Sequence, residues 1–169
     1  MEINVMLLGE YGVGKTTLLQ SYINNSFYDG ASPNIGIEHF YMKQTNTNIK
    51  YWDTAGQEKY NSQALPFIKK ANAFILVYDP SLSIEKVKEN FNFWIENIKQ
   101  NTDYQSLSNY IWIVANNKDN NISIQKDDEK NKYESFLPEI NFKEKLFVIN
   151  KLSDNDLTSL KVRYIIYDK

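Results

Sequence analysis

The fold of this chain is decided by one stretch near its amino terminus, Gly9-Glu10-Tyr11-Gly12-Val13-Gly14-Lys15-Thr16. It fits the phosphate-loop pattern, in which a glycine and four other residues are followed by Gly-Lys-Thr or Gly-Lys-Ser. An apolar run, residues 3–8, precedes it, and residues 17–23 behind it carry apolar side chains at helical spacing. Strand, glycine loop and helix in this order are the context that the pattern requires, so we predict an anion-binding loop at the start of a helix.

Each residue type in this loop suits the binding of phosphate groups. Glycine has no Cβ, so the backbone can adopt unusual dihedral angles and bring N–H groups close to an anion. Those N–H groups and the positive end of the following helix attract phosphate, the lysine reaches the outer phosphates, and the hydroxyl beside it binds Mg²⁺. The sequence therefore predicts Thr16 as a metal ligand and phosphate contacts from Gly9, Gly12, Val13, Gly14, Lys15, Thr16 and Thr17.

Composition limits the classes of protein to consider. The 169 residues suit one domain, residues 1–169, and 42% hydrophobic with 24% charged residues is ordinary for a globular protein. A net charge of -2 gives no reason to expect a nucleic acid partner. The sequence has no cysteine and carries a glutamate at position 2, so we expect no lipid anchor in the chain as given. It also has no apolar run suited to a signal peptide or a membrane span, so we expect a cytoplasmic protein.

Apolar runs and turn residues predict alternating strands and helices along the rest of the chain. After a long loop, residues 24–36, two strands are expected at 37–44 and 49–53, and the turn between them makes an antiparallel hairpin. Further strands are expected at 73–79, 110–115 and 146–149, and helices at 61–70, 83–100, 124–137 and from 153 onward. This order predicts an α/β fold with a mostly parallel central sheet, one antiparallel edge hairpin and helices on both faces, with ligands at the carboxyl ends of the strands.

Three details of these elements can be checked against a structure. Pro66 should make the helix over 61–70 irregular. His39 is the only histidine in the sequence, so a histidine-based triad or zinc site is excluded. It falls on the hairpin and is expected at the surface. Ser83 is expected to cap the helix over 83–100, whose core-facing side chains are Ile84, Val87, Phe91, Trp94, Ile95 and Ile98.

A second motif, Asp53-Thr54-Ala55-Gly56-Gln57-Glu58, follows the strand over 49–53. Together with Gly9–Thr16 it resembles the small GTPases of the Ras superfamily, and the resemblance covers essentially the whole chain. Residues 35–40, Ile-Gly-Ile-Glu-His-Phe, and residues 52–60, which begin Trp-Asp-Thr-Ala-Gly-Gln-Glu, resemble segments of the Rab branch most closely. The resemblance implies a P-loop NTPase small G domain that binds GTP or GDP with Mg²⁺.

The resemblance also implies roles for residues in the two switch regions. Asp53 would hold Mg²⁺ through water, the Gly56 N–H would contact the γ-phosphate, and Gln57 would be the catalytic residue that orients the attacking water. Asn34 stands where the family has a threonine that binds Mg²⁺ in the GTP state, and an amide oxygen can take that place with a different geometry. Loss of the γ-phosphate would release both switches and change the surface offered to partners.

The guanine base would be held by residues far apart in the sequence. The family's Asn-Lys-x-Asp motif appears as residues 116–119, with asparagine in place of the lysine. The alternative register, residues 117–120, restores the lysine and loses the aspartate. We prefer the first because it continues the preceding strand as in the family. The implied base-binding residues are Phe27, Asn116, Asn117, Asp119, Asn150 and Lys151.

The motifs and their departures from the family pattern leave three classes of function to compare. The resemblance favours a guanine-nucleotide switch with slow GTP hydrolysis, which regulates vesicle traffic from the cytosolic face of endomembranes and meets effector, exchange-factor and GTPase-activating proteins through its switch regions. The departures at Asn34 and at Ile149-Asn150 favour instead a nucleotide-bound scaffold that does not switch. A phosphotransferase needs arginines around the transferred phosphate, and the single arginine, Arg163, lies far along the chain from every motif.

Overall fold

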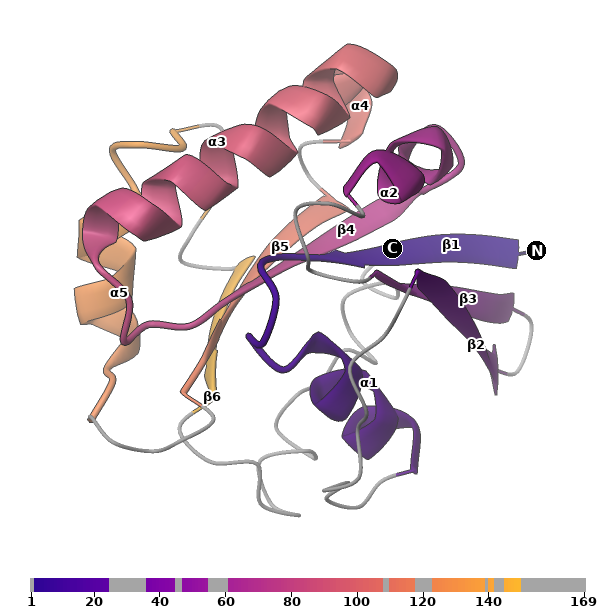
Figure 1. Ribbon diagram of the computed structural model, residues 1–169, viewed down its shortest axis with the longest axis horizontal. Coiled ribbons are helices and arrows are strands. Elements are labelled where there is room, and N and C mark those ends of the chain that lie inside the picture. Colours follow the sequence, from indigo (N-terminus) through magenta and orange to yellow (C-terminus); the bar gives the residue numbers. More distant parts are fainter. Residues whose placement is uncertain are drawn as a thin grey trace.

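The computed structural model describes residues 2–24, 36–44, 47–54, 61–107, 110–117, 123–138, 140–141 and 145–149, with backbone alone at 44, 61–63, 106 and 107. These residues form a central sheet with helices packed on its two faces (Figure 1). The helix expected from residue 153 lies wholly outside the described residues. The loop expected over 24–36 lies mostly outside them.

Within the described chain the sheet has six strands in the order β2-β3-β1-β4-β5-β6. Only the edge pair, β2 with β3, is antiparallel, and all other neighbours are parallel. This confirms the predicted mostly parallel sheet with one antiparallel edge hairpin. Because β1 lies in the middle, the loop that follows it emerges beside the carboxyl ends of β3 and β4, where ligands of such sheets bind. The strands are β1 (Glu2–Leu8), β2 (Ile37–Gln44), β3 (Thr47–Thr54), β4 (Ala73–Tyr78), β5 (Ile111–Asn116) and β6 (Leu146–Ile149).

Each face of the sheet has its own apolar core, because successive side chains of a strand point to opposite faces. On one face Val5 and Leu7 pack with Leu18 and Leu19 of helix α1 (Lys15–Asn24). On the other face the alternate residues of the sheet pack against three helices, α2 (Asn61–Ile68), α3 (Ile84–Asn101) and α5 (Lys126–Tyr133). Every residue of β4 and β5 is buried, as expected for strands covered on both faces.

Helix α3 follows the prediction closely. The Lys86 N–H donates to the Ser83 hydroxyl over 3.2 Å, which is the expected cap. The apolar stripe from Val87 to Ile98 is buried. Ile84 was predicted to face the core and does not, since it is 38% exposed in the first turn.

The bounds of several other elements differ from the prediction, most clearly those of β3 and α5. Strand β3 begins at Thr47 instead of residue 49, because the ladder with β2 continues through the pair Gln44 and Thr47. Helix α5 was expected over 124–137 but is shorter, since acidic residues that favour a helix start come only at 127–129 and Pro138 disfavours helical geometry before it. Pro66 lies inside α2, and the four-residue α4 (Tyr104–Leu107) was not predicted because one turn has no periodicity to detect.

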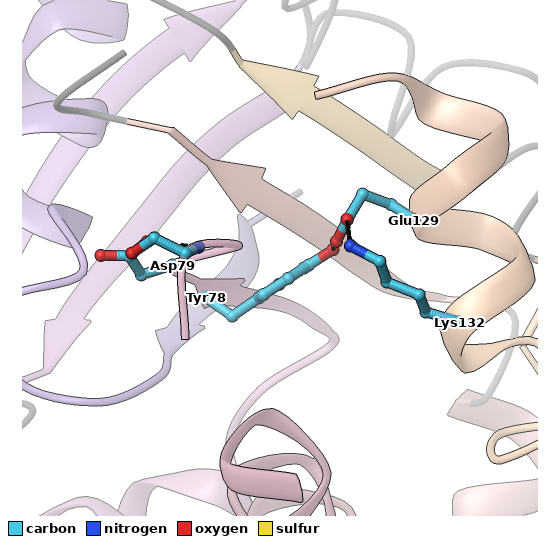
Figure 2. A network of polar contacts seen from close by, with 5 residues as sticks. Tyr78, Asp79, Glu129 and Lys132 are labelled. Carbon is cyan, nitrogen blue, oxygen red and sulfur yellow. Dashed lines mark hydrogen bonds and ion pairs between the residues drawn. The ribbon is translucent and has the colours of Figure 1, made fainter. Parts of the chain in front are cut away.

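A buried polar network joins α5 to the sheet. Figure 2 shows Tyr78 extending from the end of β4 toward Glu129 and Lys132 of α5, whereas Asp79 points away from them. The Tyr78 hydroxyl donates to Glu129 Oε2 over 2.5 Å, and Lys132 Nζ pairs with Glu129 Oε1. Burial and the neighbouring Glu129 carboxylate raise the pKa of Tyr78, so the phenol stays protonated and acts as a donor. Glu129 is fully buried, and these two contacts compensate its carboxylate.

Candidate functional site

The loop after β1 has backbone geometry that only glycine accommodates well. Gly9, Gly12 and Gly14 have φ angles of 145°, 77° and 87°, which lie in the region where a Cβ is disfavoured. A Cβ on Gly9 would come within 2.1 Å of the Val77 carbonyl oxygen, and one on Gly14 within 2.6 Å of Asn116 Nδ2. The two outer glycines therefore also let β4 and β5 approach the loop closely. This tight loop at the start of α1 is a cradle of the kind that binds phosphate.

Lys15 is folded back over the loop. Its ammonium group donates to the carbonyl oxygens of Gly9, over 3.0 Å, and Glu10, over 2.8 Å. The residue is only 5% exposed. Burial lowers the pKa of Lys15 to about 8, and the nearby carboxylates of Asp53 and Glu10 oppose that shift. The loop therefore holds a buried cation that an anionic ligand would stabilise.

Two oxygen donors predicted to hold the metal lie beside this lysine. Thr16 is half-buried in the first turn of α1. Asp53 is fully buried near the end of β3, opposite Leu7 of β1, and its charge acts on Lys15. The Thr54 hydroxyl donates to the Leu7 carbonyl over 2.7 Å and fixes the end of the strand that carries Asp53.

These donors fit Mg²⁺ better than a transition metal. Within the described residues no group of three His, Cys, Asp or Glu side chains is arranged to hold a metal ion alone. Mg²⁺ commonly takes one or two protein oxygens and completes its coordination with water and phosphate. A hydroxyl and a carboxylate beside a phosphate loop are such a donor set.

The end of β5 brings part of the predicted base-binding segment to the phosphate loop. Asn116 Nδ2 donates to the Val13 carbonyl over 2.8 Å. Its other amide atom, Oδ1, is buried and finds no hydrogen-bond partner within the described part of the chain, which leaves an acceptor for a bound group. The buried Asn117 donates its N–H to the Ile149 carbonyl over 2.8 Å, which ties β5 to the end of β6. The structure describes Asn116 and Asn117 but not residues 118–120, so the choice between the two registers stays a prediction.

The structure thus brings together the predicted site residues that it describes. The phosphate loop, Thr16, Thr17, Asp53, Asn116 and Asn117 all lie at or next to the carboxyl ends of β1, β3 and β5. The other predicted site residues lie outside the described residues and stay predictions: Phe27, Asn34, Gly56, Gln57, Asp119, Asn150 and Lys151.

One contact at the site was missed in the sequence. The Glu10 carboxylate pairs with Lys86 Nζ of α3 over 3.2 Å. Nothing in the sequence indicates this pair, because it depends on where the first turn of α3 passes the loop. The neighbouring Tyr11 is 53% exposed.

The part of the chain that the structure describes contains no helix with both the length and the apolar character needed to cross a lipid bilayer.

Comparison with known proteins agrees with this geometry. The family model described as "Ras of Complex, Roc, domain of DAPkinase" matches residues 4–119, which is more than half of the chain. Among curated proteins, "Ras-related protein Rab7" of Prunus armeniaca is 33% identical over 123 residues, which cover 70% of this chain and 58% of that protein. "Ras-related protein RABG3d" of Arabidopsis thaliana is 31% identical over 121 residues, covering 69% and 57%.

A third relative, "Ras-related protein Rab-32D" of Dictyostelium discoideum, is 34% identical over 125 residues, covering 70% of this chain and 54% of that protein. The chain thus spans somewhat more than half the length of the curated relatives it matches. The phosphate loop, the sheet order and these matches agree, and the chain belongs to the Ras superfamily of small GTPases as a Rab-like member.

Proposed function

We propose that this chain is a molecular switch that binds GTP or GDP with Mg²⁺ and hydrolyses GTP slowly. The observation that carries the proposal is the hydrogen bond from Asn116 to the Val13 carbonyl. It joins the segment expected to read the base to the loop expected to hold the phosphates, so one nucleotide can occupy both. The preformed loop and the buried Lys15 support the phosphate end of the same ligand.

The side chains have distinct roles in this proposal. Lys15 neutralises charge on the outer phosphates, and the loop N–H groups orient them. The Thr16 hydroxyl and the Asp53 carboxylate hold Mg²⁺, which, when bound, neutralises the charge that develops on the phosphate oxygens. Gln57 orients the attacking water, and Asp119 accepts hydrogen bonds from the edge of guanine. Adenine offers no matching donors there and would leave a buried carboxylate unpaired.

Hydrolysis is expected to be slow without a partner. In this superfamily an activating protein commonly supplies an arginine at the γ-phosphate, which accelerates the reaction by about 10³–10⁵. The single arginine, Arg163, is distant in sequence from the phosphate loop. Tyr11 occupies a loop position that is usually small and is expected to crowd the meeting point of Gln57 and such an arginine. Its exposure of 53% also fits a ring that turns toward solvent. Single-turnover hydrolysis by Tyr11→Gly distinguishes the two: the variant should be faster than the unaltered protein if the ring crowds the site, and equally fast if the ring turns toward solvent.

The direct test of nucleotide binding is the identity of the ligand that co-purifies with the protein. After denaturation, mass spectrometry of the released small molecules should find GDP or GTP and no adenine nucleotide. In displacement assays unlabelled GTP should compete at far lower concentration than ATP. Equal competition by ATP would refute the proposed guanine specificity.

As a Rab-like member, the chain is proposed to act in vesicle traffic at the cytosolic face of endomembranes. Effectors, exchange factors and activating proteins would bind its switch regions, which flank the hairpin of β2 and β3. The departures at Asn34 and at Ile149-Asn150 favour one competing proposal, a nucleotide-bound scaffold that does not switch. A partner that binds the GTP and GDP forms with equal affinity would favour the scaffold, and a preference for the GTP form would exclude it.

A further inference from the structure

The ion pair between Glu10 and Lys86 lies directly beside the phosphate loop. Glu10 is the first residue after Gly9, and its carbonyl oxygen accepts the 2.8 Å hydrogen bond from Lys15 Nζ. Its side chain turns to α3 and meets Lys86 Nζ at 3.2 Å. One residue thus contacts the phosphate-binding lysine through its backbone and a second lysine through its carboxylate.

Lys86 is presented by a rigid element. It lies in the first turn of α3, where its own N–H is held by the Ser83 cap and the next residue, Val87, is buried in the core. The Lys86 side chain is 46% exposed and that of Glu10 is 24% exposed. An ion pair this exposed contributes little to stability, typically 0 to about 1 kcal/mol. Its charges still act on a ligand that carries several negative charges a short distance away.

A carboxylate in a phosphate loop is unfavourable for the proposed function. Nucleotide phosphates would be repelled by Glu10, and the repulsion is larger for a triphosphate than for a diphosphate. The Glu10 charge also acts on Lys15. Lys86 neutralises this carboxylate from the side of α3.

We propose that Lys86 is a positioning residue for nucleotide binding, which acts through Glu10 by neutralising its carboxylate and thereby sets the affinity of the loop for phosphates. The inference rests on the function proposed above, since it needs phosphates at Gly9–Thr16. This electrostatic role and a purely mechanical role of the ion pair predict different changes in nucleotide affinity when one partner is replaced. If charge matters, the two partners have opposite effects on affinity; if the pair only braces the loop, losing either partner has the same effect.

The experiment measures affinity for fluorescent GDP and for a non-hydrolysable fluorescent GTP analogue, with full-length protein stripped of nucleotide. Lys86→Ala should weaken GTP-analogue binding about fivefold at low salt, the size expected for a unit charge across about 10 Å of partly solvated protein. Glu10→Gln should bind as tightly as the unaltered protein or more tightly, and the double variant should resemble Glu10→Gln. Lys86→Arg, which keeps the charge, should restore the affinity.

A matched control lies on the same helix. Lys99 pairs with Glu96 over 3.3 Å, with side-chain exposures of 39% and 57%, and Lys99→Ala should leave both affinities unchanged. The loss in Lys86→Ala should be larger for the GTP analogue than for GDP, and it should shrink as ionic strength rises, because exposed charges are screened within about 8 Å at physiological salt.

Equal weakening by Lys86→Ala and Glu10→Gln, or no change in either, overturns this inference while nucleotide binding by the unaltered protein still stands. Failure of the unaltered protein to bind either nucleotide overturns the proposed function itself. Circular dichroism and urea unfolding of each variant verify that the surface changes leave the fold intact.

Discussion

Replacing Lys15 with methionine should make the empty protein more stable at neutral pH. Burial lowers the pKa of Lys15 from 10.5 to about 8, and each pKa unit corresponds to about 1.4 kcal/mol. Holding the ammonium inside the empty loop at pH 7 therefore costs about 3 kcal/mol relative to water. Methionine removes that cost, but it leaves two carbonyls without their donor at about 1 kcal/mol each. We expect a net gain of about 1 kcal/mol for Lys15→Met.

The pH dependence gives a sharper result than the absolute value. A lysine whose pKa is lower in the folded than in the unfolded protein binds fewer protons when folded between pH 8 and 10.5. The free energy of unfolding therefore rises with pH across that window. At pH 9.5 the remaining penalty for Lys15 is about 1.4 kcal/mol, so the unaltered protein should gain about 2 kcal/mol relative to Lys15→Met between pH 7 and pH 9.5. Other titrating groups are common to both proteins and cancel.

Urea unfolding of both proteins without nucleotide or Mg²⁺, at pH 7 and pH 9.5, measures this difference. Lys99→Met, which changes a half-exposed lysine, is the control and should show no such change with pH. A difference between Lys15→Met and the unaltered protein that stays constant from pH 7 to pH 9.5 would show that Lys15 is charged across this range and that its burial carries no such penalty.

Four further substitutions test other parts of the structure. Gly14→Ala places a Cβ 2.6 Å from Asn116 Nδ2 at a φ of 87°, and it should cost about 2 kcal/mol of unfolding free energy. Gly12→Ala, with open space around its Cβ, should cost about half as much, and equal costs would contradict the proposed close contact. Asn117→Lys should slow nucleotide release, since a longer stem can pack over the base, and an unchanged or faster release rate would contradict this. Tyr78→Phe removes the donor to the buried carboxylate of α5. Measured by urea unfolding, it should lower the free energy of unfolding by about 1.5–3 kcal/mol. A loss below about 0.5 kcal/mol would show that the hydrogen bond contributes little.

The phosphate loop and the sheet were predictable because their signals are local in the sequence. The loop is a continuous motif between an apolar strand and a helix, and β4 and β5 are uninterrupted apolar runs that fit strands covered on both faces. The Ser83 cap was likewise predictable from its place before an apolar stripe with a 3.6-residue period. In each case a few neighbouring residues fix the local geometry.

Other features depend on contacts between segments far apart in the chain. Asn116 and Val13 are separated by 103 positions, so the bond that joins the two halves of the site follows only from the parallel order of β1, β4 and β5. Glu129 belongs to a strongly polar helix without a clear apolar face, yet it is fully buried. Its burial depends on a donor from β4, and nothing in the local sequence of α5 indicates that donor.

The phosphate loop is held by contacts from three neighbouring elements. Gly9 packs against the Val77 carbonyl of β4, Val13 accepts from Asn116 of β5, and Glu10 pairs with α3. These contacts fix the shape of the loop, and such preorganisation increases affinity. The same rigid loop confines the Lys15 ammonium in an unfavourable, desolvated position. Bound phosphates would offset that desolvation penalty, so part of the binding free energy is expected to come from their pairing with the buried Lys15 ammonium.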